Sequence, residues 1–142
     1  MVLDDIADYL TSQGGSGVGT LGTDLFKGFM PDTPDIAVAI YETGGLEPER
    51  AMTSAAGQVV VERPRVQVVA RAQAYDYQVA RTRIHNAFVL LEGMAARSIN
   101  GTAYKYGSAV QSPFPMGRDS DGRVLICCNF DIVKALSTST ST

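Results

Sequence analysis

The glycines from Gly17 to Gly22 are the first residues of this sequence whose spacing could do chemistry. The stretch GVGTLG matches G-x-G-x-x-G, the phosphate-binding loop of dinucleotide-binding folds. That loop follows a buried strand and opens a helix, because a helix N-terminus supplies the N–H groups that hold the pyrophosphate. Here a helical pattern precedes the glycines, and a short strand pattern, TDLFKGFM, follows them. We therefore expect a turn that ends a helix and leads into a strand, and no nucleotide site.

The two cysteines and the single histidine are the next candidates for reactive groups. Cys127 and Cys128 are adjacent in a strand-like segment, so their side chains point to opposite faces and a bond between them would distort the backbone. A metal site needs more ligands, and His85 is far away in the sequence. No nucleophile motif accompanies His85. We expect buried cysteines, a partly exposed helical histidine, and no catalytic residue, cofactor or bound metal.

Closely spaced aspartates could serve as acid–base or calcium-binding groups. Asp32 and Asp35 lie in the proline-rich turn MPDTPD, which offers no desolvated cleft to shift a pKa. Asp119 and Asp121, in RDSDG, resemble the start of a calcium loop, but the third acid and the closing glutamate are missing. We expect the second pair to stabilise a hairpin turn through their short side chains.

The composition indicates a globular chain that has enough apolar residues for a core. The chain has 142 residues, of which 45% are hydrophobic and 19% are charged. No apolar run approaches the roughly 20 residues that span a membrane, and no basic, then apolar, N-terminal pattern predicts a secretory signal. We therefore expect no membrane association and a reducing cytoplasm as the place of production.

Charge is distributed unevenly along the chain. Residues 1–49 hold nine acidic residues and one basic residue, whereas residues 50–142 hold six acidic and eleven basic residues. Two interpretations are open. The two parts can interleave in the fold, or one surface can be acidic and another basic, so that copies stack head-to-tail.

Apolar periodicity predicts the order helix, strand, strand, strand, helix, strand, strand. The expected helices cover 2–13 and 75–96; the expected strands lie near 23–29 and at 36–43, 59–73, 100–112 and 123–136; a long loop covers 44–58 and a polar turn 112–122. This order predicts an α+β fold, in which a mostly antiparallel sheet is flanked by an N-terminal helix and one long central helix. We expect a single domain of residues 1–136 and a disordered Ser/Thr tail at 137–142.

Alternation in the strand at 59–73 assigns its side chains to two faces. It places Arg65, Gln67, Val69 and Arg71 together on one face. Because proline has no N–H to donate, we expect Pro64 at a sheet edge or at a bulge.

Three stretches then point to a family. The segments VLDDIADYL, GTDLFKGFMPDTPDIAVAIYETGG and ERPRVQVVARA, the last followed by the long helix, resemble the small minor capsid or tail terminator proteins of long-tailed bacteriophages. The resemblance covers about residues 2–134.

The resemblance implies a structural protein of the virion and no enzyme. Its members form a homo-oligomeric ring, usually a hexamer, at the head-proximal end of the tail tube, after assembly in the bacterial host cytoplasm. The ring stops tube growth, contacts the tail tube protein and docks to the head–tail connector proteins, while genomic DNA passes through the lumen without being read. The family has no catalytic residues to carry over.

The expected interface residues lie in the long loop, the following strand and the polar turn, because loops and arginines are common at interfaces. They are Glu47, Glu49, Arg50, Arg63, Arg65, Arg71, Arg118 and Asp119.

Two alternatives to the terminator ring remain. The first is another head–tail joining protein, an adaptor or a stopper. The second is a small-molecule-binding module that uses GVGTLG or His85, which would show ligand-induced thermal stabilisation.

Overall fold

A computed structural model describes residues 2–50 and 59–135, with side chains for all of these except residues 16, 46–50 and 59–60. The described elements are α1 (Val2–Gly14), β1 (Leu25–Lys27), β2 (Ala37–Arg50), β3 (Val59–Ala72), α2 (Tyr77–Glu92), β4 (Arg97–Ile99), β5 (Thr102–Ala109), β6 (Phe114–Arg118) and β7 (Val124–Ala135). Single 3₁₀ turns at Gly15–Gly17 and Ala74–Asp76 follow α1 and precede α2.

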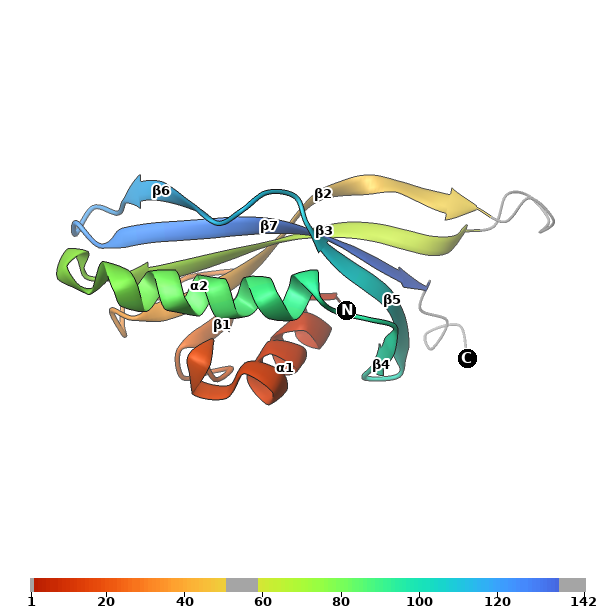
Figure 1. Ribbon diagram of the computed structural model, residues 1–142, viewed down its shortest axis with the longest axis horizontal. Helices are drawn as coiled ribbons and strands as arrows, with labels where there is room; N and C mark the ends of the chain where they lie inside the picture. Colours follow the sequence, from red (N-terminus) through yellow and green to blue (C-terminus); the bar gives the residue numbers. More distant parts are fainter. Residues whose placement is uncertain (1, 51–58, 136–142) are drawn as a thin grey trace.

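The strands form one mixed, mostly antiparallel sheet. Its order is β1-β2-β3-β7-β5-β4, and β6 also pairs with β7 (Figure 1). Only β1 and β2 are parallel, whereas the other pairs are antiparallel. β5 and β6 lie one after the other along the same edge of β7, since Ala109 pairs with Phe130 and Phe114 pairs with Cys127. The predicted α+β class and mostly antiparallel sheet are confirmed.

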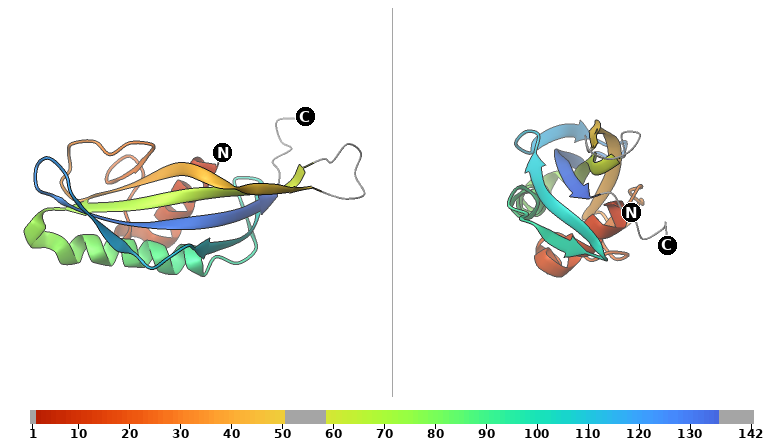
Figure 2. Two further views of the ribbon diagram at one scale, coloured as in Figure 1. Left: turned by 90° about the horizontal axis from the view of Figure 1, so that it is seen from above. Right: turned by 90° about the vertical axis from the view of Figure 1, so that its right-hand side faces the viewer.

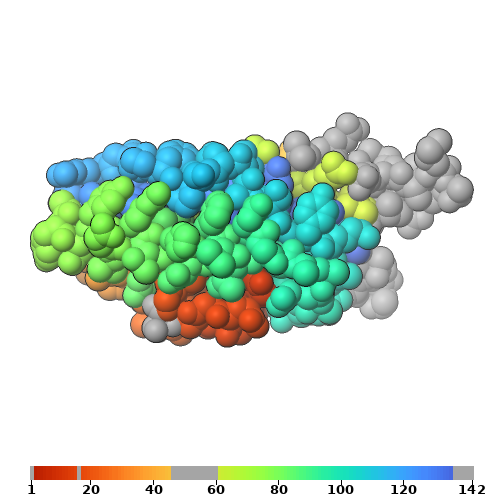
Figure 3. Space-filling view, viewed as in Figure 1, coloured from red at the N-terminus to blue at the C-terminus, as the bar shows by residue number. Residues whose placement is uncertain are grey.

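Both helices cover one face of the curled sheet, as the views in Figures 1 and 2 agree. α2 occupies the middle of the surface in Figure 3, between β6 and α1. Its buried stripe consists of Ala80, Ile84, Ala87 and Leu91. Helical residues three and four apart share a face, which explains why this stripe reaches the sheet. Each large apolar side chain sealed here stabilises the fold by roughly 1.5–3 kcal/mol.

The prediction of a loop at 44–58 is wrong for residues 44–50, which continue β2. The register between β2 and β3 shifts after Thr43 and again after Leu46 and Glu49. These irregularities admit the glycines and the proline that suggested a loop. Residues 51–58, the remainder of that predicted loop, lie outside the described residues.

Pro64 lies opposite one of these irregularities, as the sequence predicted. Thr43 pairs with Arg65 and Leu46 pairs with Arg63, so β2 has one more residue here than β3. A Cβ atom on Gly45 would fall 2.3 Å from the carbonyl oxygen of Arg63. The bulge therefore needs a glycine at position 45, because only backbone without a side chain fits so close to β3.

The prediction of a polar turn at 112–122 is also wrong for five of its eleven residues. Residues 114–118 form β6, and only the residues between β6 and β7 make the turn. The proline and glycine in FPMGR are typical of a turn, but a strand forms there, with its own register shift between Pro115 and Gly117. The short β4 was not predicted, since three residues carry no periodicity. The predicted tail at 137–142 lies outside the described residues.

Within the part of the chain that the structure describes, no helix is long and apolar enough to cross a membrane.

Candidate interaction surface

The face of the sheet opposite the helices carries both polar and apolar side chains. Along β3, Val66, Val68 and Ala70 are buried on the helical face, and their neighbours Gln67 and Val69 face the other side. The alternation predicted from the sequence therefore holds. Two segments rise over this second face: the loop of residues 28–36, between β1 and β2, and the strand β6.

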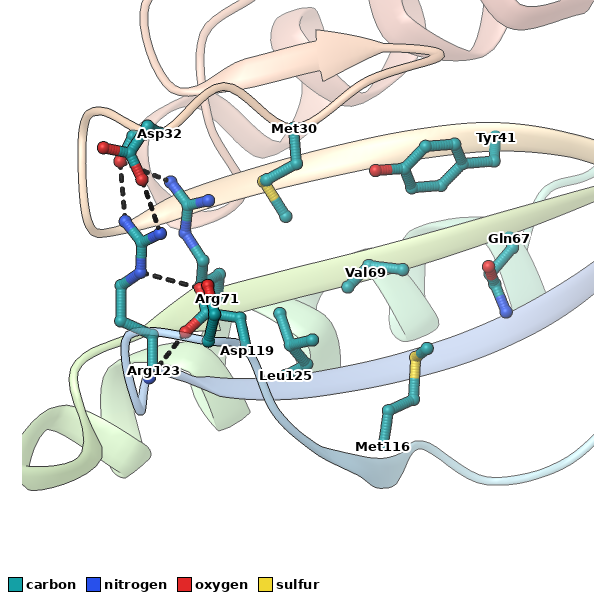
Figure 4. Close-up of a pocket in the computed structure, with 11 residues that line it drawn as sticks. Met30, Asp32, Tyr41, Gln67, Val69, Arg71, Met116, Asp119, Arg123 and Leu125 are labelled. Carbon is teal, nitrogen blue, oxygen red and sulfur yellow. Dashed lines mark hydrogen bonds and ion pairs between the residues drawn. The ribbon is translucent and has the colours of Figure 1, made fainter.

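Between these two segments lies a groove of about 470 Å³, called the outer groove below. Met30 of the loop and Met116 of β6 stand on its two sides (Figure 4). Tyr41, Val69 and Leu125 lie between them, on β2, β3 and β7. The outer groove is open, and its five apolar side chains are flanked by polar and charged ones, so it suits an extended or protruding segment that presents both kinds of group.

Two buried arginines close one end of the outer groove. Arg71 is 3% exposed and Arg123 is 5% exposed. Arg71 donates through Nε to the carbonyl oxygen of Asp35 at 3.1 Å and through Nη2 to that of Pro34 at 2.5 Å. It therefore holds the 28–36 loop to β3 through backbone acceptors.

Arg123 joins the same loop to the turn between β6 and β7. Its guanidinium contacts the carboxylates of Asp32 at 2.9 Å and Asp119 at 2.8 Å (Figure 4). It also contacts those of Asp35 and Asp121, each at 3.2 Å. A planar fork of five donors suits several acceptors at once. Arg71, Arg123, Asp32, Asp35 and Asp119 are called the arginine cluster below.

Asp119 also builds the turn, as the sequence predicted. Its Oδ1 accepts hydrogen bonds from the amides of Asp121 at 3.0 Å and Arg123 at 2.9 Å. Burial acts to raise the pKa of Asp119, but hydrogen bonds from Arg123 and the Asp121 amide outweigh it and lower the pKa. A hydrogen bond from Gln73, helped by Arg123 and opposed by burial, lowers the pKa of Asp35. Both groups are therefore held as carboxylates.

The exposed and half-buried carboxylates of the arginine cluster are paired with Arg123. Among the residues that the structure describes, no group of three or more His, Cys, Asp or Glu side chains could hold a metal ion.

A second prominent feature is the extension of β2 and β3. Residues Gly44–Arg50 of β2 and Val59–Pro64 of β3, called the arm below, continue past both helices (Figure 2). β7 supports the base of the arm, since Val61 pairs with Ala135 and Glu62 pairs with Lys134. Lys134 is buried and contacts Glu62 at 3.2 Å. The arm is thus fixed at its base by a third strand.

The predicted interface residues fall in two places. Arg71 and Asp119 meet in the arginine cluster, and Arg118 is exposed beside them on β6. Arg65, at the base of the arm, forms an ion pair with Asp131 at 2.8 Å, and Arg63 is partly buried beside the Gly45 bulge. Glu47, Glu49 and Arg50 lie on the arm by their backbone, and their side chains lie outside the described residues.

Gly17 of the glycine motif and His85 each line a separate open depression beside α2, of about 340 and 350 Å³. GVGTLG begins at the last residue of the 3₁₀ turn that follows α1 and leads into β1, as expected. His85 is exposed on α2 and stacks on Phe88, with ring centroids 6.5 Å apart. Cys127 and Cys128 are both free and buried. Burial raises the pKa of the Cys127 thiol and, with the nearby Cys127, raises that of Cys128 to about 11, which keeps both protonated.

Acidic residues from the first part of the chain pair with basic residues from the second. Asp24 contacts Arg83 at 2.8 Å, and Arg123 contacts Asp32 and Asp35. For these residues the first interpretation of the charge distribution holds, since the two parts of the sequence interleave.

Sequence reasoning missed Met30, Met116 and Arg123 as members of one surface. Arg123 stands at the start of the last predicted strand, where nothing in the sequence indicates its partners. The only available signal was the rigid turn MPDTPD, whose two aspartates both contact Arg123.

Comparison with known proteins indicates the family of this chain. A comparison with curated proteins gives no match. Residues 14–135 match the family described as bacteriophage tail terminator protein. That match covers most of the chain, including every strand, both sides of the outer groove and the described part of the arm. The chain therefore belongs to the bacteriophage tail terminator protein family, whose members are structural proteins of the phage tail.

Proposed function

We propose that the protein forms a ring on the head-proximal end of the phage tail tube, where it stops tube polymerisation and joins the tail to the head connector. Membership of the tail terminator family supports a structural role in the virion and contacts with other tail or head proteins. The ring, its position and its partners are our proposal. In this proposal the ring has six copies, is assembled in the host cytoplasm, and lets DNA pass through its lumen.

The observation that carries this proposal is the arm. It continues past both helices on a base of three paired strands, so it reaches away from the core without losing its backbone pairing. A projection whose strands are already paired suits contact with another subunit or with the tube, because its backbone needs little further ordering when it binds.

The interface residues expected from the sequence fit this role in part. We propose that Arg63 and Arg65, with Glu47, Glu49 and Arg50 farther along the arm, contact a neighbour or the tube. Arg118 and Asp119 lie at the opposite end of the sheet, beside the outer groove. A subunit with different surfaces at its two ends can make the heterologous contacts that close a ring. Arg71 and Asp119 support that end through the arginine cluster.

The test is tube polymerisation with purified tail tube protein, followed by electron microscopy of tube lengths. Adding this protein should shorten and cap the tubes at one end. Gly45→Ala should weaken capping, because its Cβ would collide with the backbone of Arg63 and Pro64 and distort the arm. Gly44→Ala is the matched control, since a Cβ there meets nothing within 4 Å. Tubes that grow to the same length with and without the protein would refute the proposal.

A further inference from the structure

Exposed carboxylates outnumber the exposed cation Arg118 around the closed end of the outer groove. The side chain of Asp32 is 82% exposed, and those of Asp35 and Asp121 are also exposed. The two arginines that they surround are buried. A partner that enters the outer groove therefore meets methionine side chains along its length and carboxylates at its closed end. The matching chemistry is an apolar side chain next to a cation.

The chain carries that combination on β5. Tyr106 is 50% exposed, and the neighbouring Lys105 is exposed as well. In a regular strand two consecutive side chains point to opposite faces. Here the register with β7 shifts between Tyr104 and Tyr106, and Tyr104 and Gly107 on either side are buried. The bulge therefore turns Lys105 and Tyr106 outward together.

Within one copy these two features are too far apart to meet. Tyr106 pairs with Val133, near the end of β7, whereas Leu125, which lines the outer groove between the two methionines, is near the start of β7. Eight residues of strand separate the two positions, a length of about 26 Å. Figure 1 accordingly shows β5 and β6 toward opposite ends of the long axis.

We propose that the outer groove of one copy receives Lys105 and Tyr106 of a second copy. The Tyr106 ring lies between Met30 and Met116, where sulfur–aromatic contacts are favourable. The Lys105 ammonium faces the carboxylate of Asp32. Because the two surfaces differ and lie at opposite ends, the contact is heterologous and repeats from copy to copy until a ring closes. This inference rests on the proposed ring and specifies one of its subunit contacts.

The test is a charge exchange in the full-length protein, with self-association measured by sedimentation equilibrium at low salt. Lys105→Glu and Asp32→Lys should each weaken association about tenfold in Kd or more, and the double variant should recover most of that loss. Glu42→Lys, an acid-to-base change at an exposed position outside the outer groove, should leave Kd unchanged. Thermal melting of each variant confirms folding.

A second pair of variants avoids the arginine cluster. Tyr106→Ser and Met116→Gln should each weaken association, and together they should cost little more than either alone, since both remove the same contact. Three results would each overturn the contact. The single variants could associate like wild type, the double charge variant could show the sum of the two losses, or the wild-type protein could stay monomeric. Tube capping is measured on the same samples. If the wild-type protein caps tubes but the variants do not change self-association, the proposed function stands and this subunit contact is refuted.

Discussion

The two faces of the central sheet are built from the same strands but are closed in different ways. On the helical face, Val66, Val68, Ile126 and Phe130 are fully buried beneath α1 and α2. On the other face, the arginine cluster closes one end by ion pairs, the small side chains of Ala39 and Cys127 are buried, and the outer groove stays open beside them. The comparison indicates that the first face supplies stability and that the second face is available for binding.

The helical face should show the largest response to mutation. Phe130 is completely buried, with its ring tilted against Phe88 at a centroid distance of 6.4 Å. Phe130→Ala should lower the free energy of unfolding by about 3–5 kcal/mol, because it removes buried area and leaves a cavity. Urea unfolding followed by circular dichroism measures this. A loss below about 1 kcal/mol, typical of an exposed position, would show that the two faces are not distinguished in this way.

The helical face was also the more predictable one from sequence. Helical spacing in 77–92 and alternation in 65–71 each place apolar residues on a definite side, so local periodicity was sufficient. Bulges, in contrast, interrupt this periodicity. The glycines and prolines of β2 and β6 suggested turns, because nothing in the sequence shows that Gly45 lies opposite Pro64. The outer groove was not predictable, because Met30 and Met116 come from segments that meet only in the folded chain.

The arginine cluster should give the next largest effect, and a local one. Arg123→Gln leaves four carboxylates without their shared cation, so the 28–36 loop should detach from the β6–β7 turn while the helical core persists. Hydrogen exchange followed by mass spectrometry should show faster exchange at residues 28–36 and 119–122 and unchanged protection in α2. Arg123→Lys should restore only part of the protection, since an ammonium cannot reproduce the fork. Uniformly faster exchange would mean that the cluster supports the whole fold.

Acid should weaken the same cluster by a smaller amount. The pKa values of Asp35 and Asp119 are lowered from the usual 3.8 in the folded protein. Each therefore contributes stability that is fully present above the unfolded pKa and is lost as the pH falls through the lower folded pKa. Urea midpoints should fall below about pH 4 more steeply in wild type than in Asp119→Asn, whose amide oxygen can still accept the turn hydrogen bonds. Identical pH profiles would show that Asp119 acts only as a turn residue.

The smallest effect on stability should come from the outer groove, and this result most sharply separates the two faces. Met116 is about half exposed, so Met116→Gln removes little buried area and should change the free energy of unfolding by no more than about 0.5 kcal/mol. If the open face serves binding, the same substitution should nevertheless weaken self-association, because the contact buries the methionine only in the assembly. The matched control is Val89→Gln, an equally exposed apolar residue on α2, which should be neutral in both measurements. Equal effects of the two substitutions on association would remove the special role of the outer groove, whereas a large loss of stability from Met116→Gln would make this face a second core.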